Sequence, residues 1–265
     1  AAALTLDGSL SLAPDGRPRA FDLTGRIADP AGGGPVLLPI SGGDITVAGA
    51  DLDVSYDADA GDSYTARIEV TTLDLGPAEV ARLSFDASGQ IAQSPQGLAV
   101  SSPIAIVVEG LRHDDAALAE ALGDAARLTA QVSWLQGAPL ILSDLDTRAG
   151  DLSLLGMAAV RYGENRLTLT TDLAAEAGNL ARFAAAAGQP LAGSLSAAVT
   201  GEAELLSGAF DMVLNGTGTD LSLAEGLPPE LLTGDTLLTV SALRDETGLT
   251  LRELSLAGQE LSLNA

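Results

Sequence analysis

Residues 140–154 read LILSDLDTRAGDLSL, and residues 249–263 repeat that rhythm as LTLRELSLAGQELSL. With the preceding residue included, six of sixteen positions are identical across a spacing of 109 residues, without a gap. A shorter copy lies upstream, since residues 43–49 read GDITVAG and residues 150–156 read GDLSLLG. Self-similarity at a fixed period is typical of arrays whose units bury their apolar faces against neighbours. The pattern therefore predicts one continuous extended body built from repeats of about 105–109 residues.

Within these copies apolar and polar residues alternate, as they do in a strand with one buried face. The same alternation occurs in most other segments, for example in Tyr64–Val70 and Leu128–Trp134. Clusters of Asp and Gly, such as Asp57–Asp62 and Asn215–Gly218, separate the alternating runs and are typical of turns. The predicted fold class is all-β with a few short helices, as an elongated and mainly antiparallel sheet.

Short helices are expected between the repeats. His113–Ala126 places Leu and Ala on one stripe after two aspartates, and Asn179–Ala187 is followed by Gly188. Pro77–Arg82 and Pro228–Leu232 could each form one or two helical turns.

The expected organisation has three parts. Residues 1–127 form a first repeat with a helical hinge near 113–126. Residues 128–236 form a second repeat with a hinge near 179–187, and residues 237–265 begin a third.

Composition limits the functions that the chain can have. Hydrophobic residues make up 46% of the sequence but aromatic residues only 3%, so Leu, Ala and Val must supply the burial. A packed sandwich needs bulky side chains in its gap of about 10 Å, which leaves either a thin closed core or an unfilled apolar groove. The net charge of −23 argues against binding to nucleic acid or to anionic membrane surfaces.

Residues suited to catalysis or metal binding are few. There is no cysteine, and His113 is the only histidine, placed where we expect an exposed helix start. Around Asp57, Asp59 and Asp62, the glycine and the distal glutamate of a calcium-binding loop are missing at their fixed positions. The Gly-rich loop Ala31–Pro35 is not followed by Lys and Ser or Thr. We therefore expect no enzyme activity, no metal and no cofactor.

The longest strand-like apolar run, Ile104–Val108, is far shorter than the roughly 20 residues that span a bilayer. The chain begins at Ala1 without methionine and stops within an apparent strand, residues 261–265. We interpret it as an internal fragment of a longer protein.

Two segments carry a resemblance to a known family. Residues 179–183 (NLARF) precede GQPLAGSL at residues 188–195, and residues 232–236 (LTGDT) lead to DETGLTL at residues 245–251. This order of short helix, G-x-P-L-x-G-x-L and fresh strand resembles the TamB family of translocation and assembly module proteins, within the AsmA-like superfamily. The similarity is clearest over residues 130–265.

The resemblance implies a sheet folded lengthwise into a taco-like trough with an apolar interior. It implies a protein anchored in the inner membrane that crosses the periplasm of a double-membraned bacterium. It also implies a role in phospholipid transport between the two membranes and in the assembly of outer-membrane proteins and autotransporters. A barrel partner of the TamA type would then bind through regions outside this fragment.

On this interpretation, phospholipid acyl chains lie against one strip of aliphatic side chains. The residues predicted to line that groove are Ile45, Val47, Leu52, Val54, Leu152, Leu154, Leu167, Leu169, Leu195, Val199, Leu221, Leu223, Leu249, Leu251, Leu261 and Leu263. Two alternatives stay open. One is a secreted β-solenoid adhesin or autotransporter passenger with a filled core, and the other is a purely structural spacer.

Overall fold

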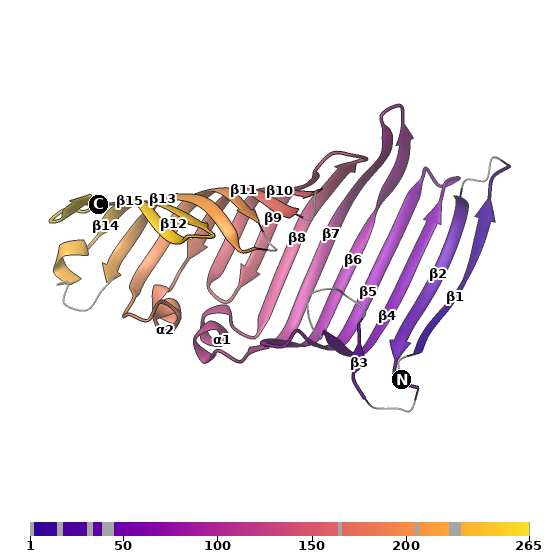
Figure 1. Ribbon diagram of the computed structural model, residues 1–265, viewed down its shortest axis with the longest axis horizontal. Coiled ribbons are helices and arrows are strands. Elements are labelled where there is room, and N and C mark those ends of the chain that lie inside the picture. The colour runs from indigo at the N-terminus through magenta and orange to yellow at the C-terminus, as the bar shows by residue number, and fades with distance from the viewer. Residues whose placement is uncertain are drawn as a thin grey trace. The chain divides into compact units, whose positions relative to one another are not determined.

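The computed structural model describes residues 3–14, 18–30, 34–38, 45–163, 166–204, 207–222 and 229–264. Most of the described residues lie in strands and few in helices, and the sheet is antiparallel and open (Figure 1). The prediction of an all-β fold with a few short helices is therefore confirmed. Gly43 and Asp44 of the upstream repeat copy, Leu223 of the predicted lining, and most of the loop Ala31–Pro35 lie outside the described residues.

The chain divides into two compact units. The N-terminal unit comprises Ala1–Asp115 and Gly123–Gly137, and the C-terminal unit comprises Ala116–Leu122 and Ala138–Ala265. The strands of the N-terminal unit are β1 (Ala3–Leu12), β2 (Pro18–Ala28), β3 (Val36–Leu37), β4 (Thr46–Asp57), β5 (Ser63–Asp74), β6 (Ala78–Ser94), β7 (Gly97–His113) and β8 (Ala125–Leu135).

The C-terminal unit also carries the helices. Its elements are α1 (Ala116–Leu122), β9 (Leu140–Ala149), β10 (Leu152–Gly163), β11 (Arg166–Ala177), η1 (Leu180–Phe183), α2 (Ala184–Ala187), β12 (Ala192–Glu204), β13 (Ala209–Ser222), η2 (Pro229–Leu232), β14 (Asp235–Asp245), β15 (Gly248–Ala257) and β16 (Ser262–Asn264).

Within each unit, every strand pairs antiparallel with the next strand of the chain, except that the two-residue β3 lies beside β4 and β2 pairs β4 directly. Successive connections therefore alternate between two edges. We call hairpin edge the one with the β1–β2, β4–β5 and β6–β7 turns in the N-terminal unit and the β10–β11, β12–β13 and β14–β15 turns in the C-terminal unit. The opposite edge, here called the connector edge, carries β3 in one unit and η1, α2 and η2 in the other.

The repeat in the sequence coincides with equivalent strand pairs. Residues 140–154 form β9 and the start of β10, and residues 249–263 form β15 and β16. The recurring Leu-Ser-Leu motif thus marks the first strand after a tight turn at the connector edge.

Two helical predictions differ from the structure. The helix expected over His113–Ala126 is reduced to α1, because β7 extends to His113 and β8 begins at Ala125. Pro77–Arg82 forms no helical turn, since Ala78 already begins β6 and pairs with His113 of β7. Pairing on both sides outweighs the preference of proline for a first helical position. The helices expected near 179–187 and 228–232 are present as η1 with α2 and as η2.

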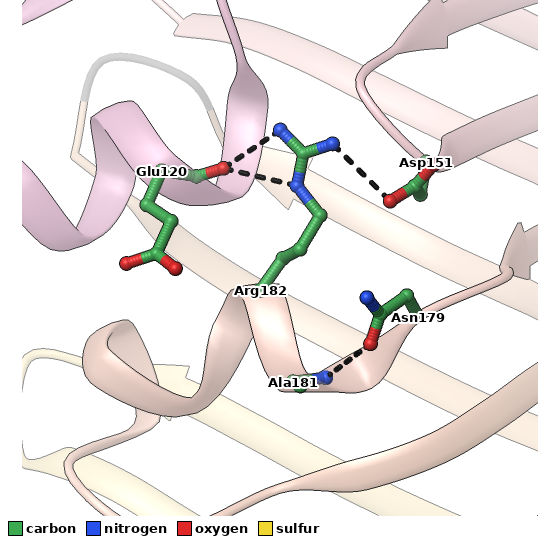
Figure 2. A network of polar contacts seen from close by, with 5 residues as sticks. All are labelled: Glu120, Asp151, Asn179, Ala181 and Arg182. Carbon is green, nitrogen blue, oxygen red and sulfur yellow. Dashed lines mark hydrogen bonds and ion pairs between the residues drawn. The ribbon is translucent and has the colours of Figure 1, made fainter.

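One arginine ties the short helices of the C-terminal unit together. Arg182 of η1 donates from Nε and Nη2 to the backbone carbonyl of Glu120 in α1, at 3.1 and 2.9 Å (Figure 2). Its Nη1 lies 3.2 Å from the carboxylate of Asp151, in the β9–β10 turn. The side chain of Asn179 begins η1 by accepting the backbone N–H of Ala181 at 3.0 Å. Because α1 has only seven residues, it is too short to be stable alone, and these bonds satisfy a carbonyl at its C-terminal end.

Replacing Arg182 with Gln should loosen α1 without disturbing the strands. Losing the charged donor costs about 1–3 kcal/mol locally, so we expect amide hydrogen exchange in residues 116–122 to accelerate about tenfold or more. Hydrogen exchange read by mass spectrometry measures this. The control is Arg148→Gln, which removes an exposed ion pair with Asp146 and should leave α1 unchanged. Unaltered exchange of α1 in the Arg182 variant would show that the arginine does not hold the helix.

Candidate functional site

The register of the N-terminal unit separates its side chains into two faces. Directly paired residues project to the same face, so rows of side chains can be followed from strand to strand. Three central rows, read across β1, β2, β4, β5, β6, β7 and β8, are Leu4, Ile27, Ala50, Val70, Leu83, Val108, Ala126; Leu6, Gly25, Leu52, Ile68, Phe85, Ile106, Leu128; and Gly8, Leu23, Val54, Ala66, Ala87, Ile104, Ala130. Every position in these rows is apolar.

The opposite face of the same strands is polar. The neighbouring row is Asp7, Thr24, Asp53, Arg67, Asp86, Ala105, Thr129. Arg67 Nε lies 2.8 Å from Asp86, and this hydrogen bond raises the pKa of the arginine. Asp7 and Arg67 also line a shallow hollow on this face, and the hollow is walled mainly by charged and polar side chains. Charge is therefore confined to one side of this sheet.

The apolar face is only half-buried. In its three central rows, Ala87 and Ala130 alone are buried. The Leu, Ile, Val and Phe side chains of these rows on β2 to β8 have intermediate exposure. Leu4 and Leu6, on the edge strand β1, are 69% and 59% exposed. A filled sandwich core would bury its large aliphatic side chains almost completely. Of the two possibilities left open by composition, the N-terminal unit therefore matches the unfilled apolar surface.

The C-terminal unit repeats this arrangement. Its rows, read across β9 to β15, are Thr147, Leu154, Ala175, Ala197, Gly216, Leu238, Leu256; Leu145, Gly156, Leu173, Val199, Leu214, Val240, Leu254; Leu142, Ala158, Thr171, Gly201, Met212, Ala242, Leu251; and Leu140, Val160, Leu169, Ala203, Phe210, Arg244, Leu249. Small residues alternate with Leu and Val, and Arg244 is the one charged residue among these described positions. This unit therefore presents a second continuous aliphatic face.

The alternation changes phase near the connector edge of the N-terminal unit. Regular alternation from Ala50 would place Val47 on the polar face, yet Val47 is 1% exposed and pairs with Leu73. The pairing of β4 with β5 is interrupted between the pairs Val47–Leu73 and Gly49–Thr71, where Thr72 has a φ of 48°. A matching interruption occurs between β6 and β7 at Ala81 and Gly110. Gly110 has a φ of 64°, and a Cβ there would lie 2.6 Å from the Cβ of Ala81, so only glycine fits. Beyond this line a further apolar row forms from Val36, Val47, Leu73, Val80 and Leu111.

Most of the predicted lining residues lie in these apolar rows. Leu52, Val54, Leu154, Leu169 and Val199 are half-buried within them. Leu152 and Leu195 pair through Ala177 in the adjoining row, and Leu167 pairs with Tyr162 at the hairpin edge. Val47 and Leu221 are buried at the connector edge, with Ile45 beside Val47, while Leu261 is half-buried before β16. Leu249, Leu251 and Leu263 occupy the last strands and are 70%, 53% and 43% exposed.

The residues considered for catalysis or metal binding have other roles. His113 is a half-buried residue at the end of β7, not an exposed helix start, and its Nδ1 accepts the backbone N–H of Asp115 at 2.9 Å. Asp57 accepts the backbone N–H groups of Asp59 and Ala60, which closes the β4–β5 turn. Asp59 pairs with Arg19 at 2.7 Å. Among the described residues, no three His, Cys, Asp or Glu side chains are grouped so that they could hold a metal ion.

Sequence reasoning missed the centre of the N-terminal face. Ile68, Phe85, Ile106 and Leu128 form its middle row together with the predicted Leu52. The signal was present, because each lies in an alternating run, but only pairing shows that the runs share one face.

Comparison with models of protein families, with curated proteins and with solved structures finds no match to this chain. Of the helices in the described part of the chain, none has the length and apolar character needed to cross a bilayer. The site is therefore interpreted from its own chemistry, which is a broad aliphatic surface with polar groups at its margins.

If the apolar face is open, a cysteine on it should react readily. The chain has no native cysteine, so single substitutions give unambiguous labelling. We expect Ile68→Cys to react with a small maleimide within about tenfold of the rate of Glu69→Cys on the polar face. The buried Val47→Cys should react only through local opening. Mass spectrometry of the labelled chain measures the three rates. A rate for Ile68→Cys as low as that of Val47→Cys would mean that the face is covered.

Proposed function

We propose that this chain binds the acyl chains of phospholipids on its aliphatic faces and lets them move along the sheet. The observation that carries this proposal is the half-buried, charge-free central face of the N-terminal unit. Each acyl CH₂ taken out of water by such a face contributes about 0.8 kcal/mol. Because the rows are apolar from strand to strand, neighbouring positions along the face offer a chain similar surroundings.

The side chains on the face favour an acyl chain over other ligands. A sugar would require aromatic platforms, yet Phe85 is the only aromatic residue in the three central rows. A peptide would require polar partners for its backbone groups, and these rows offer none. Hydrocarbon requires neither, so an aliphatic surface suits it best.

The wider role follows from the resemblance to TamB proteins. The chain would then be a periplasm-spanning segment of an inner-membrane-anchored protein. It would carry phospholipid between the two membranes and support assembly of outer-membrane proteins and autotransporters. A barrel partner of the TamA type would be engaged by other parts of that protein.

The direction of strand pairing argues against the alternative of a β-solenoid adhesin. Every strand pair among the described residues of the two units is antiparallel, whereas β-helix repeats stack in parallel. An adhesin or a spacer would also have no use for bound lipid. Lipid content therefore separates lipid transport from the other two functions.

Native mass spectrometry of the purified chain should detect phospholipid bound to the wild type. Leu169→Glu and Leu251→Arg place a charge in the apolar rows and should lower the affinity for phospholipid at least about tenfold. A tenfold loss of affinity corresponds to about 1.4 kcal/mol, which is less than the contribution of two buried CH₂ groups. The matched controls are Thr170→Glu and Thr250→Arg, which lie one residue away on the polar face and should bind lipid normally.

Circular dichroism must show that each variant is folded, because a charge placed on this face can also destabilise it. Two outcomes would contradict the proposal. One is a wild-type chain that stays free of lipid after incubation with phospholipid vesicles. The other is a folded Leu169→Glu variant that binds as much lipid as Thr170→Glu.

A further inference from the structure

The two edges of each apolar face differ in burial. At the connector edges, Val36, Val47 and Val80 in the N-terminal unit and Leu221 and Leu232 in the C-terminal unit are at most 4% exposed. The remaining buried apolar side chains among the described residues lie in central rows or at the connector edge. None belongs to the outermost row at a hairpin edge. The connector edge is therefore closed by protein, and the hairpin edge is open.

The amphipathic aromatic residues gather at the open edge. The sequence has three tyrosines and one tryptophan, and all four lie within two residues of a strand end at a hairpin edge. Tyr56 and Tyr64 flank the β4–β5 turn, Trp134 precedes the last residue of β8, and Tyr162 precedes the last residue of β10. Their partners across the sheet place them on the apolar faces, since Tyr56 pairs with Tyr64, Trp134 with Val100 and Tyr162 with Leu167.

Tyr56 shows how such a residue bridges two environments. Its ring stacks on that of Phe21 on the apolar face, with centroids 5.5 Å apart. Its hydroxyl reaches outward and donates to the carboxylate of Asp62 in the turn, at 2.8 Å. Burial, together with this hydrogen bond, raises the pKa of Tyr56, so the hydroxyl stays a neutral donor. Tyr and Trp take this position, apolar body inward and polar tip outward, where hydrocarbon meets water.

Arg244 adds a cation at the open edge of the C-terminal unit. It lies in the outermost apolar row, between Phe210 and Leu249, and the described residues give it no ion-pair partner. Two nearby carboxylates are engaged elsewhere, since Asp211 pairs with Arg252 on the polar face and Asp245 accepts from Thr247. Asp172, Glu202 and Glu204 line a hollow together with Arg244 but form no ion pair with it. The guanidinium is therefore available to an anionic group at the margin of the apolar face.

We propose that the hairpin edge of each apolar face is the headgroup boundary for a zwitterionic phospholipid, with its acyl chains directed across the rows toward the connector edge. This rests on the proposed function and adds the orientation and class of the lipid. The hydroxyls of Tyr64 and Tyr162, the Trp134 N–H and the Arg244 guanidinium are donors suited to a phosphodiester and to ester carbonyls. A net charge of −23 disfavours a lipid of net negative charge, whereas a headgroup ammonium can approach the surrounding carboxylates.

The single tryptophan reports directly on lipid depth. The full chain is loaded with phosphatidylethanolamine brominated either near the glycerol or near the chain end, and Trp134 fluorescence is recorded. We expect the shallow bromines to quench Trp134 at least about twofold more than the deep ones, because the indole lies at the proposed boundary. A second reporter, Phe85→Trp in a Trp134→Phe background, lies in a central row and should show the reverse preference.

The outcomes separate this inference from the proposed function. Stronger quenching of Trp134 by deep bromines, or no quenching while mass spectrometry shows bound lipid, would overturn the orientation and leave acyl binding intact. Absence of bound lipid in the wild type would overturn both. If both reporters prefer the same depth, the lipid has no fixed orientation and the inference is wrong.

Arg244 provides an independent test of the lipid class. Arg244→Gln should weaken the binding of phosphatidylethanolamine about tenfold, as loss of a charged hydrogen bond does, and should not change the binding of diacylglycerol with the same chains. Arg161→Gln is the matched control, because Arg161 is exposed on the polar face. Equal binding of the two lipids by the wild type would show that the phosphate is not recognised.

Discussion

The structure depends on one constraint, which is that in-register antiparallel pairing sends directly opposed side chains to the same face. Seven strands that each alternate apolar and polar residues become, in the N-terminal unit, one apolar and one polar surface. Stability then comes largely from lateral contacts between neighbours in a row, each contributing about 0.2–1 kcal/mol relative to alanine pairs. Leu52 between Gly25 and Ile68 illustrates this packing. A slip of one residue would move every leucine of a strand to the polar side.

Local breaks in that alternation close one edge of the sheet. Thr72, Asp144 and Asp220 all have φ near 50°, which is uncommon for residues other than glycine and less so for aspartate than for threonine. Each break lies within a strand, and buried residues follow two of them directly, namely Leu145 after Asp144 and Leu221 after Asp220. Asp220 is held in place by Gly234, whose carbonyl accepts the aspartate N–H and whose N–H binds its carboxylate. The strain at Thr72 and Asp220 is offset by burial at the connector edge, and the strain at Asp144 by burial of Leu145 in a central row.

The sequence was sufficient for the fold class and for assigning many leucines and valines to an apolar face, because alternation and repetition are local signals. Leu169 and Val199 could be assigned to an apolar face without knowing their neighbours. The phase change was not predictable, since Thr72 carries no signature of a left-handed residue. The helix predicted at Pro77 failed for a related reason. Its pattern was compatible with a helical turn, and pairing with β5 and β7, which no local window contains, decided for a strand.

The number of strands in each repeat accounts for the repeat length of 107 to 109 residues. Counting from β4 to β10 and from β10 to β16 gives six strands in each case, and the repeated motifs are 107 and 109 residues apart. An even number of antiparallel strands returns the chain to the same edge and the same direction, whereas an odd number would exchange the hairpin and connector edges. The unit of repetition is therefore three hairpins, and a difference of two residues can be taken up in connections such as the one that carries β3. A repeat of this kind can be added without changing which edge is covered, and this is the property that a sheet presenting one open apolar margin requires.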